Sequence, residues 1–419
     1  MQTDEKEPEA AGSEGKKELQ EYVMRTVDLS RDLSDEELLG LIDEGIRKKL
    51  QGRYLSIRDR MRLRTDIFNS IRRLDVLQEL VEDSSISEIM VNGEKQIFIE
   101  QDGRIRRWEK CFDSRQKLEE VVQQIVAGAN RMINESNPIV DARLADGSRV
   151  NIVLPPVALE GPVVTIRKFP ESPMDMERLV QLGSLTQEAA DFLKDLVIAG
   201  YNIFISGGTG SGKTTFLNAL SNDIPKDERI ITIEDSAELQ IRSIPNLVRL
   251  EMRNANTEGK NEISIRDLIK SSLRMRPDRI IVGEVRDAAA IDMLQALNTG
   301  HNGMSTGHAN SPADMLSRLE TMVLLGTDIP LLAVRKQIAS AIDVVIQLGR
   351  LRDKSRRVLE IAEVLDCVDG EIEMNTLFRF EEEGEREDGT VIGELKRCEP
   401  GLICCRKLIR AGIGAGRTG

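Results

Sequence analysis

The chain has 419 residues, 40% of them hydrophobic, and a formal net charge of −13 at pH 7. This length suffices for the cores of two or three domains, and the negative charge opposes wrapping of nucleic acid, so no nucleic-acid partner is expected. No run of about 18 apolar residues occurs, and residues 1–20 are acidic and polar, so the sequence predicts a cytoplasmic protein with neither signal peptide nor intrinsic membrane anchor.

The N-terminal part changes from helical to strand-like patterning near residue 78. Residues 1–33 are charged and poorly patterned, which predicts a mobile acidic leader. Ser34 and Glu37 have the spacing of a capping box, and the apolar periodicity after them predicts a helical arm over 34–77. Short alternating runs separated by Asn-Gly and Asp-Gly turns then predict a small α+β domain over 78–170.

The C-terminal part is predicted to be an α/β domain. Residues 171–184 have little β pattern and are expected to be a linker. Helix and strand patterns alternate over 185–380, which predicts a mainly parallel sheet with helices on both faces. Residues 381–419 begin acidic and end in a short apolar stretch, so we expect a mobile tail that could finish in a docked helix.

A glycine-rich motif follows the apolar run at 201–205. Gly207, Gly212, Lys213 and Thr214 satisfy G-x-x-x-x-G-K-[ST], and a helix-forming stretch comes next. Backbone N–H groups and the helix N-terminus can surround a β-phosphate, Lys213 can neutralise β and γ oxygens, and the Thr214 hydroxyl is placed for Mg²⁺. A purely structural glycine turn is the alternative. The complete motif between strand and helix favours phosphate binding.

Three carboxylates are expected at strand ends downstream of this loop. Glu234 and Asp235 end one apolar run and Glu284 ends another. Ligands of an open parallel sheet bind outside the carboxyl ends of its strands. We therefore expect Glu234 and Asp235 near Mg²⁺, and Glu284 to orient or deprotonate an attacking water. Capping of the following helix is the alternative for each carboxylate.

The two histidines of the chain both lie in the stretch "GHNGMSTGH", at His301 and His308. His308 follows a predicted strand, so it could lie near the γ-phosphate as a sensor or hydrogen-bond donor. A helix-capping or core-packed histidine is an equally good interpretation of the residues alone. A zinc site is not favoured, because no third ligand has a suitable spacing.

Arginines are expected to supply the remaining positive charge at the nucleotide. The candidates are Arg143, Arg149, Arg167, Arg249, Arg253 and Arg286. Arg266, Lys270 and Arg274 recur every four residues and give one predicted helix a basic face. We expect that face to be solvated.

Four stretches match the type II/IV secretion ATPases in order and wording, and they most resemble the CpaF branch that serves Tad/Flp pili. They are "SGGTGSGKTT", "ITIEDSAELQI", "LRMRPDRIIVGEVRD" and "ALNTGHNGMSTGHANSPADMLSRLETMV". With "ISEIMVNG" and "GPVVTIRKF" before them, the resemblance covers about residues 78–380. It implies a RecA-like P-loop domain behind a smaller PAS-like domain. It further implies a homohexameric ring that binds ATP and Mg²⁺ and acts on an inner-membrane platform protein.

The resemblance also implies roles for individual residues. Glu234 and Asp235 belong to the Asp box, Glu284 is the Walker B glutamate, and the His box runs from His301 to His308. The nucleotide-contacting arginines of the family map onto Arg143, Arg149 or Arg167. The Walker A loop consists of Gly207, Gly208, Thr209, Gly210, Ser211, Gly212, Lys213, Thr214 and Thr215.

Two departures limit which subgroup the chain resembles. The Walker B strand has no aspartate before Glu284, so direct Mg²⁺ ligation by that strand is doubtful. The tetracysteine element of the general-secretion subgroup is absent, since the cysteines lack its spacing. The alternatives to a pilus motor are a DNA-translocating motor, a traffic ATPase of a type IV secretion system, and a nucleotide-binding switch that does not cycle.

Overall fold

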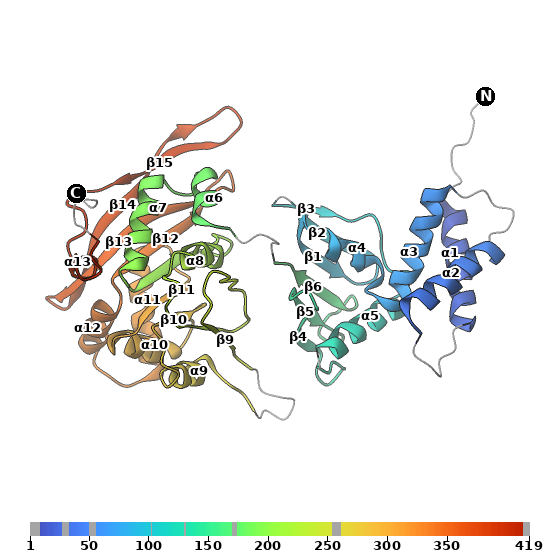
Figure 1. The fold of residues 1–419 in the computed structure, drawn as a ribbon, viewed down its shortest axis with the longest axis horizontal. Helices are drawn as coiled ribbons and strands as arrows, with labels where there is room; N and C mark the ends of the chain where they lie inside the picture. Colours follow the sequence, from blue (N-terminus) through green and yellow to red (C-terminus); the bar gives the residue numbers. More distant parts are fainter. Residues whose placement is uncertain are drawn as a thin grey trace. The chain divides into compact units, whose positions relative to one another are not determined.

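The computed structural model describes residues 9–26, 33–49, 56–101, 103–129, 131–169, 174–253 and 261–413. The chain divides into two compact units, residues 1–171 and 172–419, and each is described by itself (Figure 1). Across the described ranges, no helix combines the length and the apolar character that a membrane crossing requires.

Three helices at the start of the first unit share one small apolar core. Leu19 and Val23 are fully buried in the same cluster as Leu38 and Ile42, each pair at helical spacing. The expectation of a mobile leader over 1–33 is therefore wrong for this helix, whose few core positions stand among many charged residues. The helices are α1 (Glu9–Thr26), α2 (Asp35–Lys49) and α3 (Ile57–Arg72).

The predicted capping box at the start of α2 is confirmed. Ser34 N donates to Glu37 Oε2 at 2.9 Å, and Glu37 N donates to Ser34 Oγ at 3.2 Å. These two reciprocal bonds satisfy backbone donors that the first turn of a helix otherwise leaves without partners.

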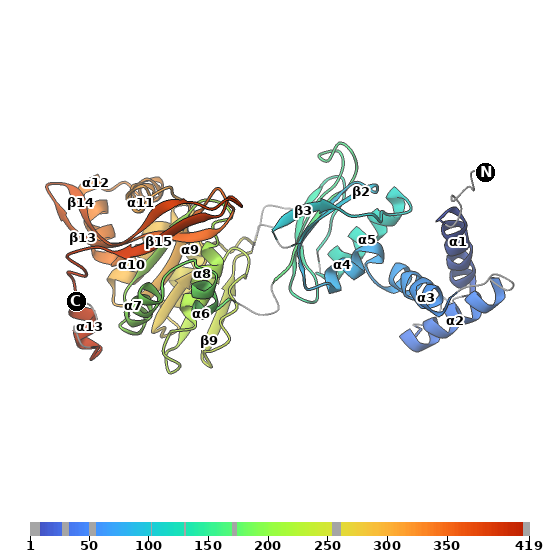
Figure 2. The same cartoon turned by 90° about the horizontal axis from the view of Figure 1, so that it is seen from above.

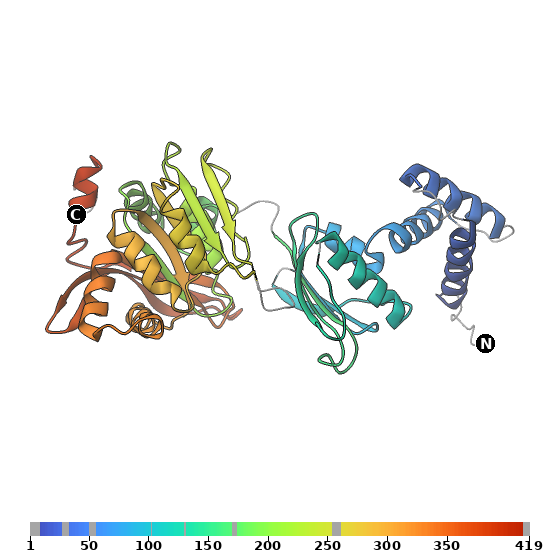
Figure 3. The same cartoon turned by 90° about the horizontal axis from the view of Figure 1, so that it is seen from below.

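A six-stranded sheet, antiparallel throughout, forms the rest of the first unit, in the strand order β3-β2-β1-β6-β5-β4. Alternate residues of its strands share a core with Leu118, Val122 and Ile125 of α5, which runs along one face (Figure 3). The α+β prediction is confirmed. The elements are η1 (Asp75–Leu77), α4 (Gln78–Glu82), β1 (Ile86–Asn92), β2 (Gln96–Gln101), β3 (Arg104–Arg107), α5 (Arg115–Gly128), β4 (Ile139–Arg143), β5 (Arg149–Val153) and β6 (Val163–Arg167).

The second unit is built on a nine-stranded sheet with the order β15-β14-β13-β12-β7-β11-β10-β8-β9. The six strands from β12 to β9 pair in parallel, as predicted, and the other three add antiparallel pairings. The strands are β7 (Ile203–Gly207), β8 (Ile230–Glu234), β9 (Leu247–Glu251), β10 (Arg279–Val282), β11 (Asn302–Gly307), β12 (Val344–Arg350), β13 (Arg356–Val368), β14 (Glu371–Glu385) and β15 (Val391–Arg397).

Helices cover both faces of this sheet, so each face has its own apolar core (Figure 2). Leu193 and Leu217 belong to one core, and Leu294 and Leu319 belong to the other. Leu179 of α6 is buried in the first core, so part of the expected linker over 171–184 is packed helix. The helices are α6 (Met176–Gln181), α7 (Gln187–Ile198), α8 (Lys213–Ser221), α9 (Ile265–Ser272), α10 (Ala289–Asn298), α11 (Pro312–Gly326), α12 (Leu331–Ala341) and α13 (Arg406–Arg410).

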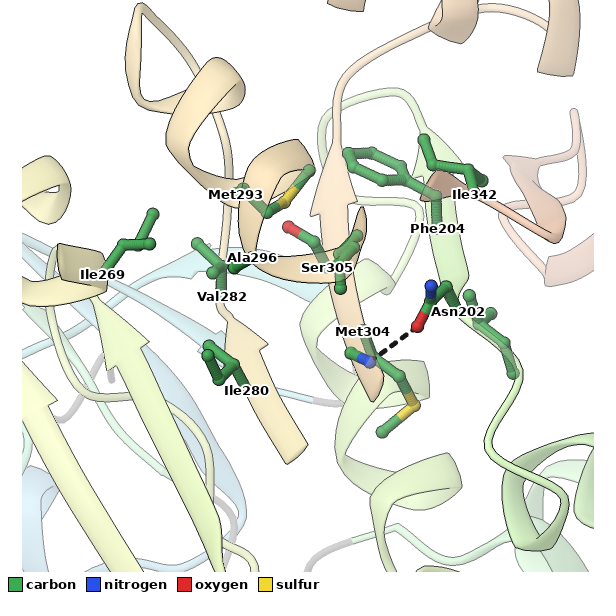
Figure 4. Close-up of a pocket in the computed structure, with 13 residues that line it drawn as sticks. Asn202, Phe204, Ile269, Ile280, Val282, Met293, Ala296, Met304, Ser305 and Ile342 are labelled. Atoms are coloured by element: carbon green, nitrogen blue, oxygen red, sulfur yellow. Dashed lines mark hydrogen bonds between the residues drawn. The ribbon is translucent and has the colours of Figure 1, made fainter. Parts of the chain in front are cut away.

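A very small cavity of about 10 Å³ lies in the second of these cores, among Phe204, Ile280 and Met293 (Figure 4). Asn202 beside it accepts a hydrogen bond from Gly303 N at 2.9 Å and donates to Ala341 O at 2.7 Å. A cavity of this size is at the lower limit for one water molecule. The cavity is therefore a packing defect of the core and not a ligand site.

The expectation of a mobile tail over 381–419 is wrong for its described residues, which extend the sheet, but the docked helix expected near its end is present as α13, whose Leu408 is buried in the core. β14 and β15 form a hairpin, and the buried carboxylate of Glu363 holds the segment after it. Glu363 accepts hydrogen bonds from Ile403 N at 2.9 Å and Cys404 N at 2.6 Å, and from Asn375 Nδ2 at 3.1 Å. Tyr201 adds a bond to Cys404 O at 2.7 Å. The many charged residues of β14 and β15 made this segment resemble a mobile tail in the sequence, although it packs on the sheet.

We expect Glu363→Gln to destabilise the second unit by about 2 kcal/mol, because the amide loses the charge and presents N–H where backbone donors point. The apparent melting temperature should fall by roughly 4–8 °C in calorimetry. Glu373→Gln on the exposed side of β14 is the matched control and should leave it unchanged. Equal melting of both variants would show that Glu363 does not anchor the tail.

Candidate functional site

The glycine-rich loop joins β7 to α8 at the carboxyl edge of the parallel strands. Gly210 and Gly212 have φ values of 73° and 93°, in the left-handed region that favours glycine. A Cβ on Gly207 would lie 2.6 Å from Ser211 Oγ and 2.7 Å from Leu348 O, closer than any side chain could approach. The glycines therefore allow a loop that wraps the N-terminus of α8, where backbone N–H groups can bind a phosphate.

The ammonium of Lys213 is buried under this loop, with 8% of the residue exposed. Its Nζ donates to Gly207 O and Gly208 O, each at 3.1 Å, and lies 3.2 Å from His308 Nδ1. Three acceptors thus meet the three N–H bonds of the ammonium. Burial lowers the pKa of Lys213, and Glu284 opposes that shift.

His308 links Lys213 to Glu284. An ammonium has no lone pair, so Nδ1 must be the acceptor and the ring proton lies on Nε2. That nitrogen is 3.3 Å from Glu284 Oε1. Burial and the charge of Lys213 lower the pKa of His308, so the ring is neutral at pH 7. A neutral imidazole is the form that can accept from the lysine and face the carboxylate with N–H.

Glu284 follows β10 and is held by Arg286. Arg286 Nη2 donates to Glu284 Oε2 at 2.8 Å, and its Nε lies 2.8 Å from Oε1. Burial alone would raise the pKa of Glu284, but Arg286, His308 and Lys213 together bring it below the usual value. The carboxylate is therefore ionised at neutral pH, which a general base requires.

Asp235 and Glu234 occupy different environments at the end of β8. Asp235 Oδ2 lies 3.4 Å from Arg286 Nη1. Asp235 therefore extends the series of contacts that runs from Lys213 through His308 and Glu284 to Arg286. Glu234 is 2% exposed, and its Oε2 accepts hydrogen bonds from Glu238 N at 2.6 Å and Leu239 N at 2.8 Å. Burial raises the pKa of Glu234. Its visible role is to hold the loop after β8.

The predicted Mg²⁺ ligands do not form a cluster by themselves. Within the part of the chain that the structure describes, no three His, Cys, Asp or Glu residues are arranged to hold a metal ion. Mg²⁺ in nucleotide sites is bound largely by phosphate oxygens and water, with few protein ligands. The half-exposed Thr214, in the first turn of α8, fits that arrangement.

The two histidines lie at opposite ends of β11. His308 follows the carboxyl end beside the loop, whereas His301 precedes the amino end. His301 Nδ1 lies 3.2 Å from Ala296 O, at the end of α10. A strand of this length separates them by roughly 20 Å. Of the two, His308 belongs to the site.

Three arginine candidates of the first unit form a row across its sheet. The strand register pairs Arg143 with Arg149, and Arg149 with Arg167. Their neighbours Ala142, Val150 and Ile166 are buried, so the arginines lie on the face away from the core. Three positions that are scattered in the sequence thus become one row of arginines, which Glu88 of β1 continues with its Oε1 3.9 Å from Arg167 Nη2.

The other arginine candidates lie in the second unit. Arg286 is in the site, whereas Arg253 donates to Asn261 O at 2.8 Å and Arg249 is exposed on the edge strand β9.

The sequence interpretation also missed a contact of the glycine-rich loop. Arg356, the first residue of β13, donates from Nε to Gly210 O at 3.0 Å. The cluster of arginines in "GRLRDKSRR" was the available signal.

Arg266 and Lys270 of α9 are solvent-exposed as expected, with 41% and 57% of their side chains accessible, but both also pair with Asp292. Arg274 lies beyond the end of α9. Arg266 Nε lies 2.5 Å from Asp292 Oδ2, and Lys270 Nζ lies 3.6 Å from Oδ1 of the same carboxylate. Only 7% of the Asp292 side chain is exposed. The basic residues therefore compensate a nearly buried charge on α10, which the periodicity of α9 alone could not reveal.

A pocket of about 530 Å³ opens beside the loop. It is lined by Gly208 and Thr209 on one side, by His308, and by Ser317 and Arg318 of α11 on the other. This volume is in the range of small-molecule sites. The pocket leaves room at the His308 end of the loop for a terminal phosphate and water.

Comparison with known proteins matches residues 72–387 to the family described as type II/IV secretion system protein. A candidate conjugal transfer protein of Mycobacterium tuberculosis is 35% identical over 329 residues, covering 77% of this chain and 92% of that protein. The type IV secretion system protein PtlH of Bordetella pertussis is 34% identical, covering 69% of this chain and 93% of that protein.

Among solved structures, the pilus retraction motor PilT with bound ADP aligns with a TM-score of 0.51 and 19% identity. The alignment covers 81% of this chain and 86% of that chain. This likeness concerns the fold, and it agrees with the RecA-like α/β domain and smaller N-terminal domain that were predicted.

We expect His308 to titrate below 6.5, the usual pKa of histidine, in NMR spectra of the nucleotide-free protein. Lys213→Ala should raise that midpoint, because it removes a positive charge and a donor to Nδ1. Glu284→Gln should lower it, because the carboxylate stabilises the imidazolium.

His301→Gln assigns the two ring signals, since the chain has only two histidines. A midpoint that neither substitution moves would show that the contacts from Lys213 to His308 and from His308 to Glu284 do not form in solution.

Proposed function

The chain belongs to the type II/IV secretion system protein family, and from that premise we propose that it is an ATP-hydrolysing motor of a pilus or secretion machine. The observation that carries the proposal is the chain of contacts from Lys213 through His308 to Glu284. It joins a phosphate-binding lysine to a carboxylate at the edge of a parallel sheet where ligands bind. A switch that never turns over needs the lysine but not the carboxylate.

Nucleotide binding begins with an exchange of partners at Lys213. Phosphate oxygens carry charge and are stronger acceptors than the carbonyl oxygens of Gly207 and Gly208. The ammonium can therefore turn from these carbonyls to the β- and γ-phosphates. Mg²⁺, when bound with the nucleotide, neutralises charge on the phosphate oxygens, and Thr214 is the side chain best placed to coordinate it.

Glu284 accepts the proton of the attacking water in this proposal. Arg286 contacts both of its oxygens and His308 Nε2 lies 3.3 Å from Oε1, so Oε2 keeps a second lone pair that can accept from a water molecule. Asp235, 3.4 Å from Arg286 Nη1, helps to hold the guanidinium in place. Arg286 thus keeps the base ionised and positioned before substrate arrives.

The arginine row of the first unit is a second candidate for contacts to phosphate. Arg143, Arg149 and Arg167 lie side by side on one face of a domain in an acidic protein. We propose that these arginines supply positive charge to the phosphates of the nucleotide. We further propose that the motor is a homohexamer, as the family resemblance implies.

The machine driven by this motor is proposed from family membership. We propose a Tad/Flp-like pilus or a type II/IV secretion system, with an inner-membrane platform protein as the partner that brings the cytoplasmic motor to the membrane. The relatives named for conjugal transfer and type IV secretion keep a traffic ATPase of such a system as a second candidate. The net charge of −13 opposes a motor that grips DNA directly.

We expect slow steady-state ATP hydrolysis confined to the hexamer-sized fraction of the purified protein. Lys213→Ala should lose nucleotide binding, and Glu284→Gln should bind ATP but hydrolyse it at least about 100-fold more slowly, because it lacks the base. Glu373→Gln, an exposed carboxylate substitution on β14, should retain wild-type activity.

Activity in a monomeric fraction would refute the requirement for a ring. Near-normal hydrolysis by Glu284→Gln would remove the catalytic assignment and leave the nucleotide switch as the better function.

A further inference from the structure

The sheet order gives the phosphate-binding loop two different flanks. β11 and then β10 lie on one side of β7, and β12 and then β13 lie on the other. Lys213 contacts His308 on the β11 side, and Glu284 follows β10, so the reacting γ-phosphate belongs to that flank. If the loop holds the β-phosphate, as the proposed function requires, a phosphate chain that runs along the sheet edge would carry the α-phosphate toward the β12 side.

Two arginines occupy this second flank, one on each side of the turn of the β12–β13 hairpin. Arg356 donates from Nε to Gly210 O at 3.0 Å, and its Cδ lies 3.4 Å from where a Cβ on Gly212 would be. Arg350 Nη1 lies 3.9 Å from the corresponding position on Gly210. Both side chains therefore lie beside the Gly210–Gly212 part of the loop.

The strand register makes these two arginines direct cross-strand partners. Like charges at such positions repel one another, and in the described ranges no carboxylate forms an ion pair with Arg350 or Arg356. The other two arginines of this hairpin, in contrast, have partners. Arg352 pairs with Glu382 and Glu385, and Arg357 donates to Gly183 O and lies over the Phe380 ring.

The hairpin is held in place without any help from a ligand. Asp353 in its turn accepts hydrogen bonds from Ser355 N at 2.9 Å and Ser355 Oγ at 2.6 Å, and from Val391 N of β15 at 2.9 Å. These bonds lower the pKa of Asp353 to about 2, so it stays ionised. The two arginines are therefore presented on a rigid support, which reduces the entropy lost when an anion binds.

We propose that Arg350 and Arg356 bind the α-phosphate of the nucleotide, on the flank opposite to Glu284. Arg350 and Arg356 are solvent-exposed and adjacent, so together they form a cationic patch that an anion can reach, and the α-phosphate is the next anionic group along a nucleotide whose β-phosphate is in the loop. Because this phosphate does not react, the pair contributes to affinity and not to the chemical step.

The test is calorimetric titration of Arg350→Ala and Arg356→Ala with ATP and with inorganic tripolyphosphate, which keeps three phosphates and lacks the nucleoside. Each substitution should weaken both ligands about tenfold, the usual value of one charge-assisted hydrogen bond. In hydrolysis assays KM should rise by a similar factor while kcat stays unchanged. Arg352→Ala, on the same hairpin but paired with glutamates, is the matched control and should change neither ligand.

A loss of ATP affinity with unchanged tripolyphosphate binding would overturn the proposal, because the pair would then contact the nucleoside. Unchanged affinity for both ligands would overturn it as well. If the proposed function itself is wrong, the calorimetric result would differ from these two outcomes. The wild-type protein would then bind neither ligand, or Lys213→Ala would bind both as tightly as the wild type does. Arg350 makes no ion pair in the described ranges, so its removal is not expected to impair folding.

Discussion

The parallel pairing of β7, β11 and β10 is the constraint on which the site depends. Parallel strands end at the same edge of a sheet, so the residues after each strand meet there although they are about 25 to 100 positions apart in the chain. Lys213, Glu284 and His308 come together for this reason. The helices on both faces exclude water from the strands, and the burial that lowers the pKa of Lys213 and His308 follows from the same packing.

The buried ammonium of Lys213 and the carboxylate of Glu284 are both stabilised by partners, and those of Lys213 can be exchanged for a ligand. Each charge has a partner in the nucleotide-free protein, since Lys213 meets two carbonyls and an imidazole, while Glu284 meets Arg286. The two carbonyl oxygens and the imidazole are weaker acceptors than a charged phosphate oxygen. The contacts of Lys213 are therefore ones that a phosphate can replace, whereas Glu284 keeps its pair with Arg286.

Local motifs were predictable and long-range charge pairing was not. The P-loop, the parallel sheet and the capping box at Ser34 follow from spacing and period, which a single stretch of sequence records. The pairing of Arg266 with Asp292 and the anchoring of residues 403–404 by Glu363 depend on strands and helices that meet only in the fold. His308 was left undecided by the sequence because a histidine after a strand is equally consistent with packing, and only its distances to Lys213 and Glu284 decide between the two.

The bond from Val391 N to Asp353 joins the turn of the β12–β13 hairpin to the start of β15, and Arg352 in the same turn forms ion pairs with two glutamates of β14. β12 to β15 are therefore tied together at the end where Arg356 contacts Gly210. A shift of these C-terminal strands would thus change a contact of the glycine-rich loop directly and not through the helices.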